Sequence, residues 1–363
     1  MQKLKIGVLM GGKSIEREVS FNSGRTVCDH LDTEHYEVIP LFQSKKGTLF
    51  IMPWRFLHRG KISDFEQRLE SEAEIIAWDS LKKTVDFIFN AMNGRYGEDG
   101  SLQGLLEILG IPYLGSKLFT SALGMDKFLQ KDFLKLQNIK TPQDVRVYKE
   151  DISRFERDLS ALIAQLKNNN ITFPCLAKPR KEGSSLGVSV INNQTELITA
   201  LKKASEIDIN NTQDVLIEEK IDGMEFTCIV LIDKHGSPLA LPPTEIVKEE
   251  TSELFDYAQK YMPGRSTKFT PARATQSQID LIQKTCIDVM NSLDIKTMAR
   301  IDGFLTPHNE IIIIDPNTLS GMAPSSFIFC QAAQLNMNHS MIINHLIETE
   351  LKNYHRFDGI PHQ

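Results

Sequence analysis

The sequence predicts an α/β protein that begins with a parallel, Rossmann-like sheet covered by helices. Strand and helix signals alternate over residues 1–120, which is typical of βα units. Strand signals then dominate from Val215 onward, and two apolar runs near the C-terminus are joined by a short turn. Together these patterns indicate an α/β chain whose later part is richer in sheet than its first part.

The first part contains strand patterns at "LKIGVLM", "YEVIPLFQ" and "VDFIFNAM", with helical patterns at "SGRTVCDHLD" and "LQGLLEILG". Two glycine-rich charged segments, "GGKSIEREVSFNSG" and "NGRYGEDGSLQG", each follow a strand and lead into a helix. Small ligands usually bind at such strand-to-helix turns. Glu16 is positioned there to hold an ammonium group, although Glu16 and Glu18 would also simply favour a helix N-terminus.

The middle of the chain predicts a helix in "FERDLSALIAQLKNNN" and then two strands around a glycine loop in "FPCLAKPRKEGSSLGVSVI". Backbone N–H groups and hydroxyls of the loop at 183–187 can wrap a phosphate, with positive charge from Lys178. A Gly-Ser hairpin turn is the simpler alternative. In "VLIEEKIDGMEF", Glu218 and Glu225 stand where a carboxylate can accept hydrogen bonds from ribose hydroxyls, or form a solvated acidic loop.

A long polar segment at 248–272 separates the later strands, and a connection of this length is either functional or disordered. A helix with one apolar face follows it. The residues of that face are Ile279, Ile282, Cys286, Val289, Met290 and Leu293.

The segment "ARIDGFLTPHNEIIIIDPNTLSG" predicts a β-hairpin. A turn with His308 and Asn309 at its tip places Asp302 opposite Asp315 and Arg300 opposite Asn317, with all four side chains on one face. Two carboxylates so close together destabilise a sheet unless a positive charge lies between them. Carboxylate and amide oxygens suit Mg²⁺. The alternative is a surface hairpin with solvated acidic ends.

Composition excludes several other classes of protein. The 363 residues suit two or three domains, and 41 Lys+Arg against 47 Asp+Glu give a net charge of −6, so neither nucleic acid nor a membrane surface is an expected partner. Five scattered cysteines without a C-x-x-C motif indicate neither a zinc site nor disulfides. The sequence lacks an apolar run of about 18 residues, so we expect a soluble cytoplasmic protein.

A second nucleotide-binding motif competes at the N-terminus, where residues 7–14 satisfy the P-loop expression G-x-x-x-x-G-K-[ST]. "IIIIDP" would then be the aspartate strand of a P-loop kinase or NTPase centred on Lys13. A P-loop must follow its strand, however, and Gly7 lies within the apolar run itself. This alternative is therefore the weaker one.

Taken in order, the motifs resemble those of the D-alanine:D-alanine ligases of the ATP-grasp superfamily over essentially the whole chain. The matching segments are "GGKSIEREVSFNSG", "GRYGEDGSLQG", "IPYLGSKLFTSALGMDK", "KPRKEGSSLGVS", "VLIEEKIDGMEFT", "FDYAQKY", "ARIDGF" and "DPNTLSGM". The resemblance implies a three-domain ATP-grasp architecture. The domains would be residues 1–120 for the first amino acid, 121–213 with the phosphate loop, and 214–363 with the metal site and a lid at 248–272.

The resemblance also implies a role for each matching residue. ATP would be bound by Lys127, Lys178, Glu182, Ser184, Ser185, Glu218, Glu219, Ile221, Glu225 and Lys260. Two Mg²⁺ ions, with Mn²⁺ as an alternative, would be held by Asp302, Asp315 and Asn317. The amino acids would contact Glu16, Lys260, Ser326 and Phe327, while Ser184 and Tyr261 join Glu16 in a hydrogen-bonded network and Arg300 with the Gly321 backbone stabilises the oxyanion.

The implied reaction joins two D-alanines at the expense of ATP, through an acyl phosphate, for peptidoglycan precursor synthesis by a cytoplasmic homodimer. Five residues depart from the usual family pattern, with Asn93 for His, Phe255 for Tyr, Asp315 for Glu, Ser320 for Pro and Phe327 for Leu. These departures leave open a ligase for other amino acids, such as D-alanine with D-serine. Tyr261 indicates an amine rather than a hydroxy-acid acceptor, because related depsipeptide-forming ligases are expected to have Phe there.

Overall fold

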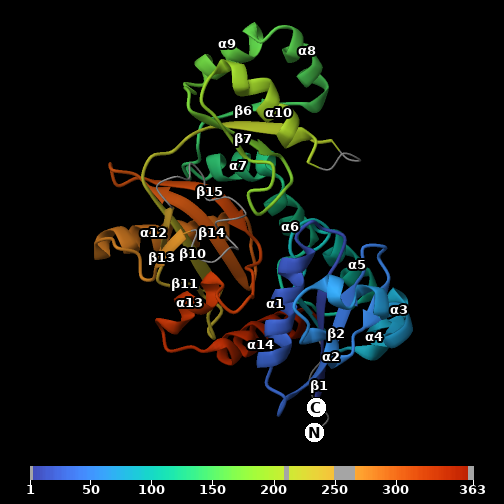
Figure 1. Cartoon of the computed structure of the whole chain (residues 1–363). Helices are drawn as coiled ribbons and strands as arrows, with labels where there is room; N and C mark the ends of the chain where they lie inside the picture. The colour runs from blue at the N-terminus through green and yellow to red at the C-terminus, as the bar shows by residue number, and fades with distance from the viewer. Residues whose placement is uncertain (1–2, 208–211, 249–265, 359–363) are drawn as a thin grey trace.

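The computed structural model describes residues 3–207, 212–248 and 266–358, and the described strands form three sheets (Figure 1). Helices connect and cover these sheets, which is the α/β class that the sequence predicts. None of the described helices is both long and apolar enough to cross a membrane.

The N-terminal sheet has five strands in the order β4-β3-β2-β1-β5. Its centre is parallel as predicted, because β1 pairs with β2 and β5 in that sense, but β3 and β4 are added antiparallel, so the sheet is mixed. The strands are β1 (Leu4–Gly11), β2 (Tyr36–Gln43), β3 (Leu49–Ile51), β4 (Glu74–Ile76) and β5 (Phe87–Asn90). The helices of this part are α1 (Arg17–His30), α2 (Trp54–Leu57), α3 (Leu69–Glu72), α4 (Leu81–Thr84) and α5 (Ser101–Leu109).

The structure rules out the P-loop alternative at residues 7–14. Strand β1 continues through Gly11, so Gly7 is a strand residue, and a Cβ added to it would lie 2.8 Å from side-chain atoms of Leu41 and Val85. A P-loop needs its first glycine in the loop after the strand. The motif match at Lys13 is therefore accidental.

The second sheet has four antiparallel strands in the order β6-β9-β7-β8. They are β6 (Asp144–Val147), β7 (Cys175–Pro179), β8 (Ser189–Ile191) and β9 (Val215–Glu219). Two helices, α6 (Leu118–Met125) and α7 (Lys127–Leu136), lead into it, and α8 (Ile152–Arg157), α9 (Ser160–Asn168) and α10 (Leu197–Ser205) belong to the same part. The strand β9, which the sequence analysis assigned to residues 214–363, thus belongs to this sheet.

The predicted helix in "FERDLSALIAQLKNNN" is two helices, α8 and α9. Asp158 between them has an extended backbone, and its carboxylate accepts a hydrogen bond from the Ser160 N–H at 2.9 Å. Aspartate competes in this way with the helical hydrogen bonds of the backbone, so it starts a new helix instead of continuing the old one.

The third sheet has six strands, with β13-β12-β10-β14-β15 in order and β11 paired to β10. The strands are β10 (Met224–Ile232), β11 (Pro238–Ala240), β12 (Thr244–Lys248), β13 (Ser266–Phe269), β14 (Met298–Leu305) and β15 (Ile311–Asn317); the helices are α12 (Gln276–Ser292), α13 (Phe327–Ala333) and α14 (His339–Asp358). The predicted lid at 248–272 is therefore too long, since Ser266–Phe269 pairs with β12. Residues 249–265 lie outside the described part of the chain.

The C-terminal hairpin has the predicted register near the carboxylates but a different turn. Asp302 faces Asp315, as predicted, whereas Leu305 faces Ile311, and a β-bulge lies next to Asp302. The turn has three residues instead of two, with Asn309 in the left-handed region at φ 59°. Proline favours such a turn and asparagine tolerates that φ. The extra turn residue and the bulge offset each other.

Helix α14 returns to the N-terminal part of the molecule, where it packs against α1 (Figure 1). Glu350 on α14 is buried and accepts a hydrogen bond from the Thr297 hydroxyl. Burial raises the pKa of Glu350 to about 7, against the opposing effects of Thr297 and Lys117. The folded protein therefore keeps a proton on Glu350 that the unfolded chain releases at lower pH.

We expect Glu350→Gln to weaken the dependence of stability on pH. Because the pKa of Glu350 is higher in the folded state, its contribution is fully present below the unfolded-state pKa and is lost as the pH rises through about 7. The free energy of unfolding should fall by about 2 kcal/mol less in the variant than in the wild type between about pH 5 and 8. Urea titrations at several pH values measure this, and parallel curves for the two proteins would contradict it.

Candidate active site

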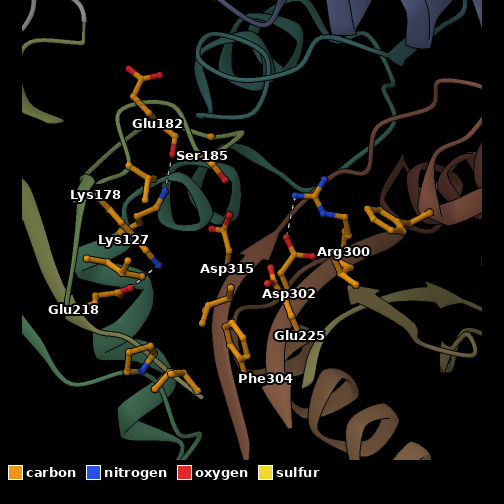
Figure 2. Close-up of a pocket in the computed structure, with 18 of the residues that line it drawn as sticks. Lys127, Lys178, Glu182, Ser185, Glu218, Glu225, Arg300, Asp302, Phe304 and Asp315 are labelled. Atoms are coloured by element: carbon orange, nitrogen blue, oxygen red, sulfur yellow. Dashed lines mark hydrogen bonds and ion pairs between the residues drawn. The ribbon is translucent and has the colours of Figure 1, made fainter. Parts of the chain in front are cut away.

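A pocket lies between the four-stranded and six-stranded sheets, and it gathers most of the residues singled out from the sequence (Figure 2). It is lined by strands β7, β9, β14 and β15, by the glycine loop and by the segment before α13. The predicted residues that line it are Lys127, Lys178, Glu182, Ser185, Glu218, Glu219, Ile221, Glu225, Arg300, Asp302, Asp315, Gly321, Ser326 and Phe327.

A second, smaller pocket adjoins the first and contains the remaining predicted residues that the structure describes. Glu16, Ser184 and Asn317 line it. The two pockets share Lys127, Glu182, Gly183, Arg300, Asp315 and Gly321. Groups bound in the two pockets would therefore meet beside these shared residues. Lys260, Tyr261 and Phe255 lie outside the described residues.

Two lysines provide positive charge on one side of the larger pocket. Lys127 begins α7, and its ammonium donates a hydrogen bond to the Glu182 carbonyl at 2.7 Å. Lys178 lies on β7, with its Nζ 2.5 Å from Glu218 Oε2. Burial lowers the pKa of Lys178, but the charge of Glu218 outweighs it and the pKa is raised overall. Lys178 is therefore a permanent cation in this pocket.

Glu218 lies between two lysines. Its Oε1 accepts a hydrogen bond from Lys131 on α7 at 2.6 Å, and its Oε2 faces Lys178. Burial favours the neutral acid, but the charges of Lys131 and Lys178 outweigh burial and lower the pKa of Glu218 to about 2. The carboxylate expected at the adenine thus joins α7 to the sheet and orients Lys178.

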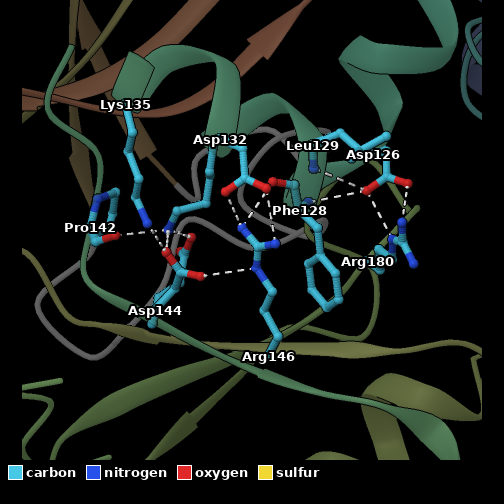
Figure 3. Close-up of polar contacts among 11 residues, drawn as sticks. Asp126, Phe128, Leu129, Asp132, Lys135, Pro142, Asp144, Arg146 and Arg180 are labelled. Atoms are coloured by element: carbon cyan, nitrogen blue, oxygen red, sulfur yellow. Dashed lines mark hydrogen bonds and ion pairs between the residues drawn. The ribbon is translucent and has the colours of Figure 1, made fainter. Parts of the chain in front are cut away.

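Further polar contacts hold α7 against the sheet (Figure 3). Asp126 accepts hydrogen bonds from two backbone N–H groups at the start of α7 and pairs with Arg180 at 2.7 Å. Arg146 on β6 donates hydrogen bonds to Asp132 and lies 3.6 Å from Asp144. These contacts place the first turns of α7, and with them Lys127.

We expect Lys131→Met to lower the free energy of unfolding by about 1.5–3 kcal/mol, because it removes a buried hydrogen bond between charged groups and leaves Glu218 with Lys178 alone. Lys131 is 4% exposed and Glu218 is 2% exposed. Chemical denaturation measures the loss.

A matched control is Lys135→Met, one turn further along α7. The Lys135 side chain is 45% exposed and pairs with Asp144 at 2.7 Å. Asp144 keeps Lys131 and Arg146 nearby in the variant, so the loss of Lys135 should cost less than about 1 kcal/mol. Equal losses for the two variants would refute the assigned role of Lys131.

The glycine loop has the setting that its sequence predicts, because β7 and β8 bracket it as an antiparallel pair. Ser184 and Ser185 both have left-handed backbones, with φ of 49° and 56°. The Ser184 hydroxyl donates a hydrogen bond to Glu16, which brings the N-terminal part of the chain to the loop. Compact loops with exposed N–H groups bind anions such as phosphate.

The paired carboxylates face the pocket from the third sheet. Asp302 accepts hydrogen bonds from the Thr227 hydroxyl at 2.6 Å and from Arg300 at 3.2 Å. Asp315 stands opposite it, and the Asn317 amide lies next on the strand. The described residues contain no cluster of three or more His, Cys, Asp or Glu that could hold a metal. A metal site here would therefore need the Asn317 amide oxygen and phosphate oxygens of a bound nucleotide in addition to the two carboxylates. This all-oxygen donor set suits a hard cation.

Comparison with known proteins assigns the family. Residues 5–116 match the model described as "D-ala D-ala ligase N-terminus", and residues 134–348 match "D-ala D-ala ligase C-terminus". The chain is 32% identical to a D-alanine–D-alanine ligase of Halothermothrix orenii, over 97% of this chain and 99% of the relative. A relative of the same name from Thermoanaerobacter sp. is 33% identical over 98% of both. The chain belongs to the D-alanine–D-alanine ligase family.

Solved structures agree with this assignment. The ligase is similar to the VanG D-Ala:D-Ser ligase of Enterococcus faecalis, with a TM-score of 0.78 and 28% identity over 96% of this chain and 100% of that one. It is also similar to the D-alanine–D-alanine ligase of Bacillus anthracis complexed with ATP, with a TM-score of 0.71 and 26% identity over 97% and 99%. The ATP-grasp fold expected from the resemblance is confirmed.

Three charged residues in or beside the candidate site were not predicted from the sequence. Lys131 follows Lys127 by one helical turn, a spacing that places both on one face of α7. Lys268 lies on β13 with its Nζ 4.5 Å from the centroid of the Phe327 ring. Glu98 lines the smaller pocket beside Glu16. The "GEDG" segment around Glu98 is a signal that could have indicated the third residue.

Proposed function

We propose that this ligase joins two D-alanines to D-alanyl-D-alanine through an acyl phosphate, with ATP as the energy source. The observation that carries the proposal is that the two pockets share Lys127, Arg300, Asp315 and Gly321. A carboxylate bound in the smaller pocket and the terminal phosphate of a nucleotide in the larger pocket would meet at these residues. Phosphoryl transfer to a carboxylate requires this juxtaposition.

We assign ATP to the larger pocket. Its adenine would lie along the backbone of residues 219–221, its ribose hydroxyls at Glu225, and its phosphates at Lys127, Lys178 and the glycine loop with Ser184 and Ser185. Glu182 supplies its carbonyl to Lys127 and thereby fixes that ammonium in the pocket. The relative from B. anthracis that is complexed with ATP supports this assignment.

We assign Mg²⁺ to Asp302, Asp315 and Asn317. Asp302 and Asp315 stand opposite each other, and a bound cation would offset the repulsion between their carboxylates. When bound there, Mg²⁺ neutralises charge on the phosphate oxygens. The chain's own contribution is to hold Asp302 in place through Thr227 and Arg300.

The amino acids are assigned to the residues around the junction of the pockets. Glu16 would bind the first ammonium, Ser326 the second carboxylate, and Phe327 would line the second subsite. Arg300 and the Gly321 N–H would stabilise the oxyanion that forms when the second amine attacks. Lys260 and Tyr261 keep their proposed roles at the second substrate and in the network with Ser184 and Glu16.

A ligase of D-alanine with D-serine is the second candidate, because the chain is 28% identical to the VanG D-Ala:D-Ser ligase. Asn93 and Ser320, which depart from the usual family pattern, line the smaller and larger pockets respectively. Substitutions at such positions change the shape of the pocket, and such a change alters the preference between two similar amino acids only modestly.

The proposal is tested by measuring ADP release with a panel of D- and L-amino acids and identifying the product by mass. D-alanine alone should support ADP release with one dipeptide formed per ADP. If D-alanine supported ADP release only in the presence of D-serine, the result would favour the second candidate. Equal release with and without amino acids would overturn both.

We further propose the division into domains near residues 1–120, 121–219 and 220–363, with the second boundary placed after β9. A cytoplasmic homodimer in peptidoglycan precursor synthesis remains the expected setting. Light scattering on the purified protein measures the oligomeric state.

A further inference from the structure

The smaller pocket contains a second carboxylate besides Glu16. Glu98 follows the turn after β5, and its Oε2 accepts a hydrogen bond from the Gly94 N–H at 2.6 Å. Glu16 approaches the same glycine, since a Cβ added to Gly94 would lie 2.2 Å from Glu16 Oε2. The two carboxylates therefore converge on one wall of the pocket.

This wall carries two carboxyl groups, and among the described residues the one that belongs to Glu98 is not paired with a cation. Within the described part of the chain, Glu98 forms no ion pair, and its one hydrogen bond comes from a backbone N–H. Burial and the nearby charge of Glu16 raise the pKa of Glu98 to about 8, against the hydrogen bond from Gly94 and the charge of Arg300. At neutral pH Glu98 is therefore largely protonated until a cation lies beside it, and a bound ammonium would favour its charged form. A buried carboxylate without a cationic partner is costly, and a ligand that brings a positive charge removes that cost.

We propose that Glu98 and Glu16 together form a clamp of two carboxylates for the ammonium of the first amino acid. The inference rests on the proposed function, and it adds a binding residue to the first-substrate subsite. The carboxylate end of the same substrate would then point toward Arg300 and Gly321, which line the pocket where it meets the larger one. Glu98 would thus set both the affinity and the direction of the first substrate.

The test is Glu98→Gln, which keeps the size and the hydrogen-bonding oxygen but removes the charge. A hydrogen bond between charged groups contributes enough that its loss should raise the KM of the first D-alanine roughly 10- to 100-fold. The KM of the second D-alanine and that of ATP should change less than about twofold. The two D-alanine constants are obtained from the dependence of the initial rate on D-alanine concentration.

Propanoate separates binding of the ammonium from support of the loop. It has the carboxylate and the methyl group of the substrate but no ammonium, so its inhibition constant should be the same in the wild type and in Glu98→Gln. Asp99→Asn is the matched control. Asp99 caps the N–H groups of Tyr96 and Ser101 in the same loop and does not line the pocket, so a structural effect would appear in that variant too.

The KM values and the propanoate inhibition constants together decide whether Glu98 binds the ammonium. A rise confined to the first D-alanine, with unchanged propanoate inhibition, supports the clamp. Equal weakening of D-alanine and propanoate, or an unchanged KM in Glu98→Gln, overturns the clamp and leaves the proposed function standing if the wild type forms dipeptide. A wild type that forms none overturns both.

Discussion

Asp302→Asn and Asp315→Asn are each expected to reduce turnover about 1000-fold or more while the fold stays intact. The two carboxylates stand opposite each other on β14 and β15 and face the larger pocket. In the proposed metal site, removing one charge would weaken the hold on Mg²⁺, which would stabilise the transferred phosphate by several kcal/mol. Steady-state rates at increasing Mg²⁺ concentration measure the loss.

The fold should not suffer in these variants, because two opposed like charges destabilise a sheet and each variant removes one of them. Glu310→Gln serves as the control, since Glu310 lies at the far end of the same hairpin, where it pairs with Lys140 at 2.5 Å. Near-normal rates for both aspartate variants at saturating Mg²⁺ would disprove a metal role for the hairpin.

Lys178→Ala is expected to raise the KM for ATP roughly 10- to 100-fold, because it would remove the proposed charged contact with phosphate. Lys13→Ala should leave that KM nearly unchanged. Lys13 is exposed and lies 5.8 Å from the centroid of the Tyr96 ring, and the strand β1 rules out a P-loop before it. Initial rates at varied ATP concentration compare the two variants.

Stability must be measured alongside, since Lys178 also balances Glu218. A variant that remains folded but binds ATP normally would contradict the assigned role of Lys178. A larger effect for Lys13→Ala than for Lys178→Ala would contradict the assignment of the phosphates to Lys178.

Local patterns predicted the carboxylate pair well. Side chains alternate along a strand, so Asp302 and Asp315 share a face whenever the strands pair in that register. The turn was wrong by one residue, because Pro307 and Asn309 favour a three-residue loop, and the bulge beside Asp302 restored the register. The predicted pairing of the two aspartates is correct because the extra turn residue and the bulge have opposite effects on the register.

Contacts between distant segments were harder to predict. Lys131 and Glu218 are separated by 87 residues in the sequence, and no local pattern indicates that they pair. The same limit applies to β9, because a strand signal alone does not show which sheet the strand joins. The glycine loop and Glu16 were identified separately, and only the fold shows that Ser184 donates a hydrogen bond to Glu16.

The most direct test of the account follows oxygen atoms through the reaction. D-alanine labelled with ¹⁸O at both carboxylate oxygens is incubated with the enzyme and unlabelled ATP, and the phosphate and dipeptide are analysed by mass. Activation of the carboxylate at the junction of the two pockets predicts that one ¹⁸O from the first D-alanine leaves with the phosphate, while the other stays in the peptide carbonyl. Phosphate without ¹⁸O, formed together with ADP, would contradict the account.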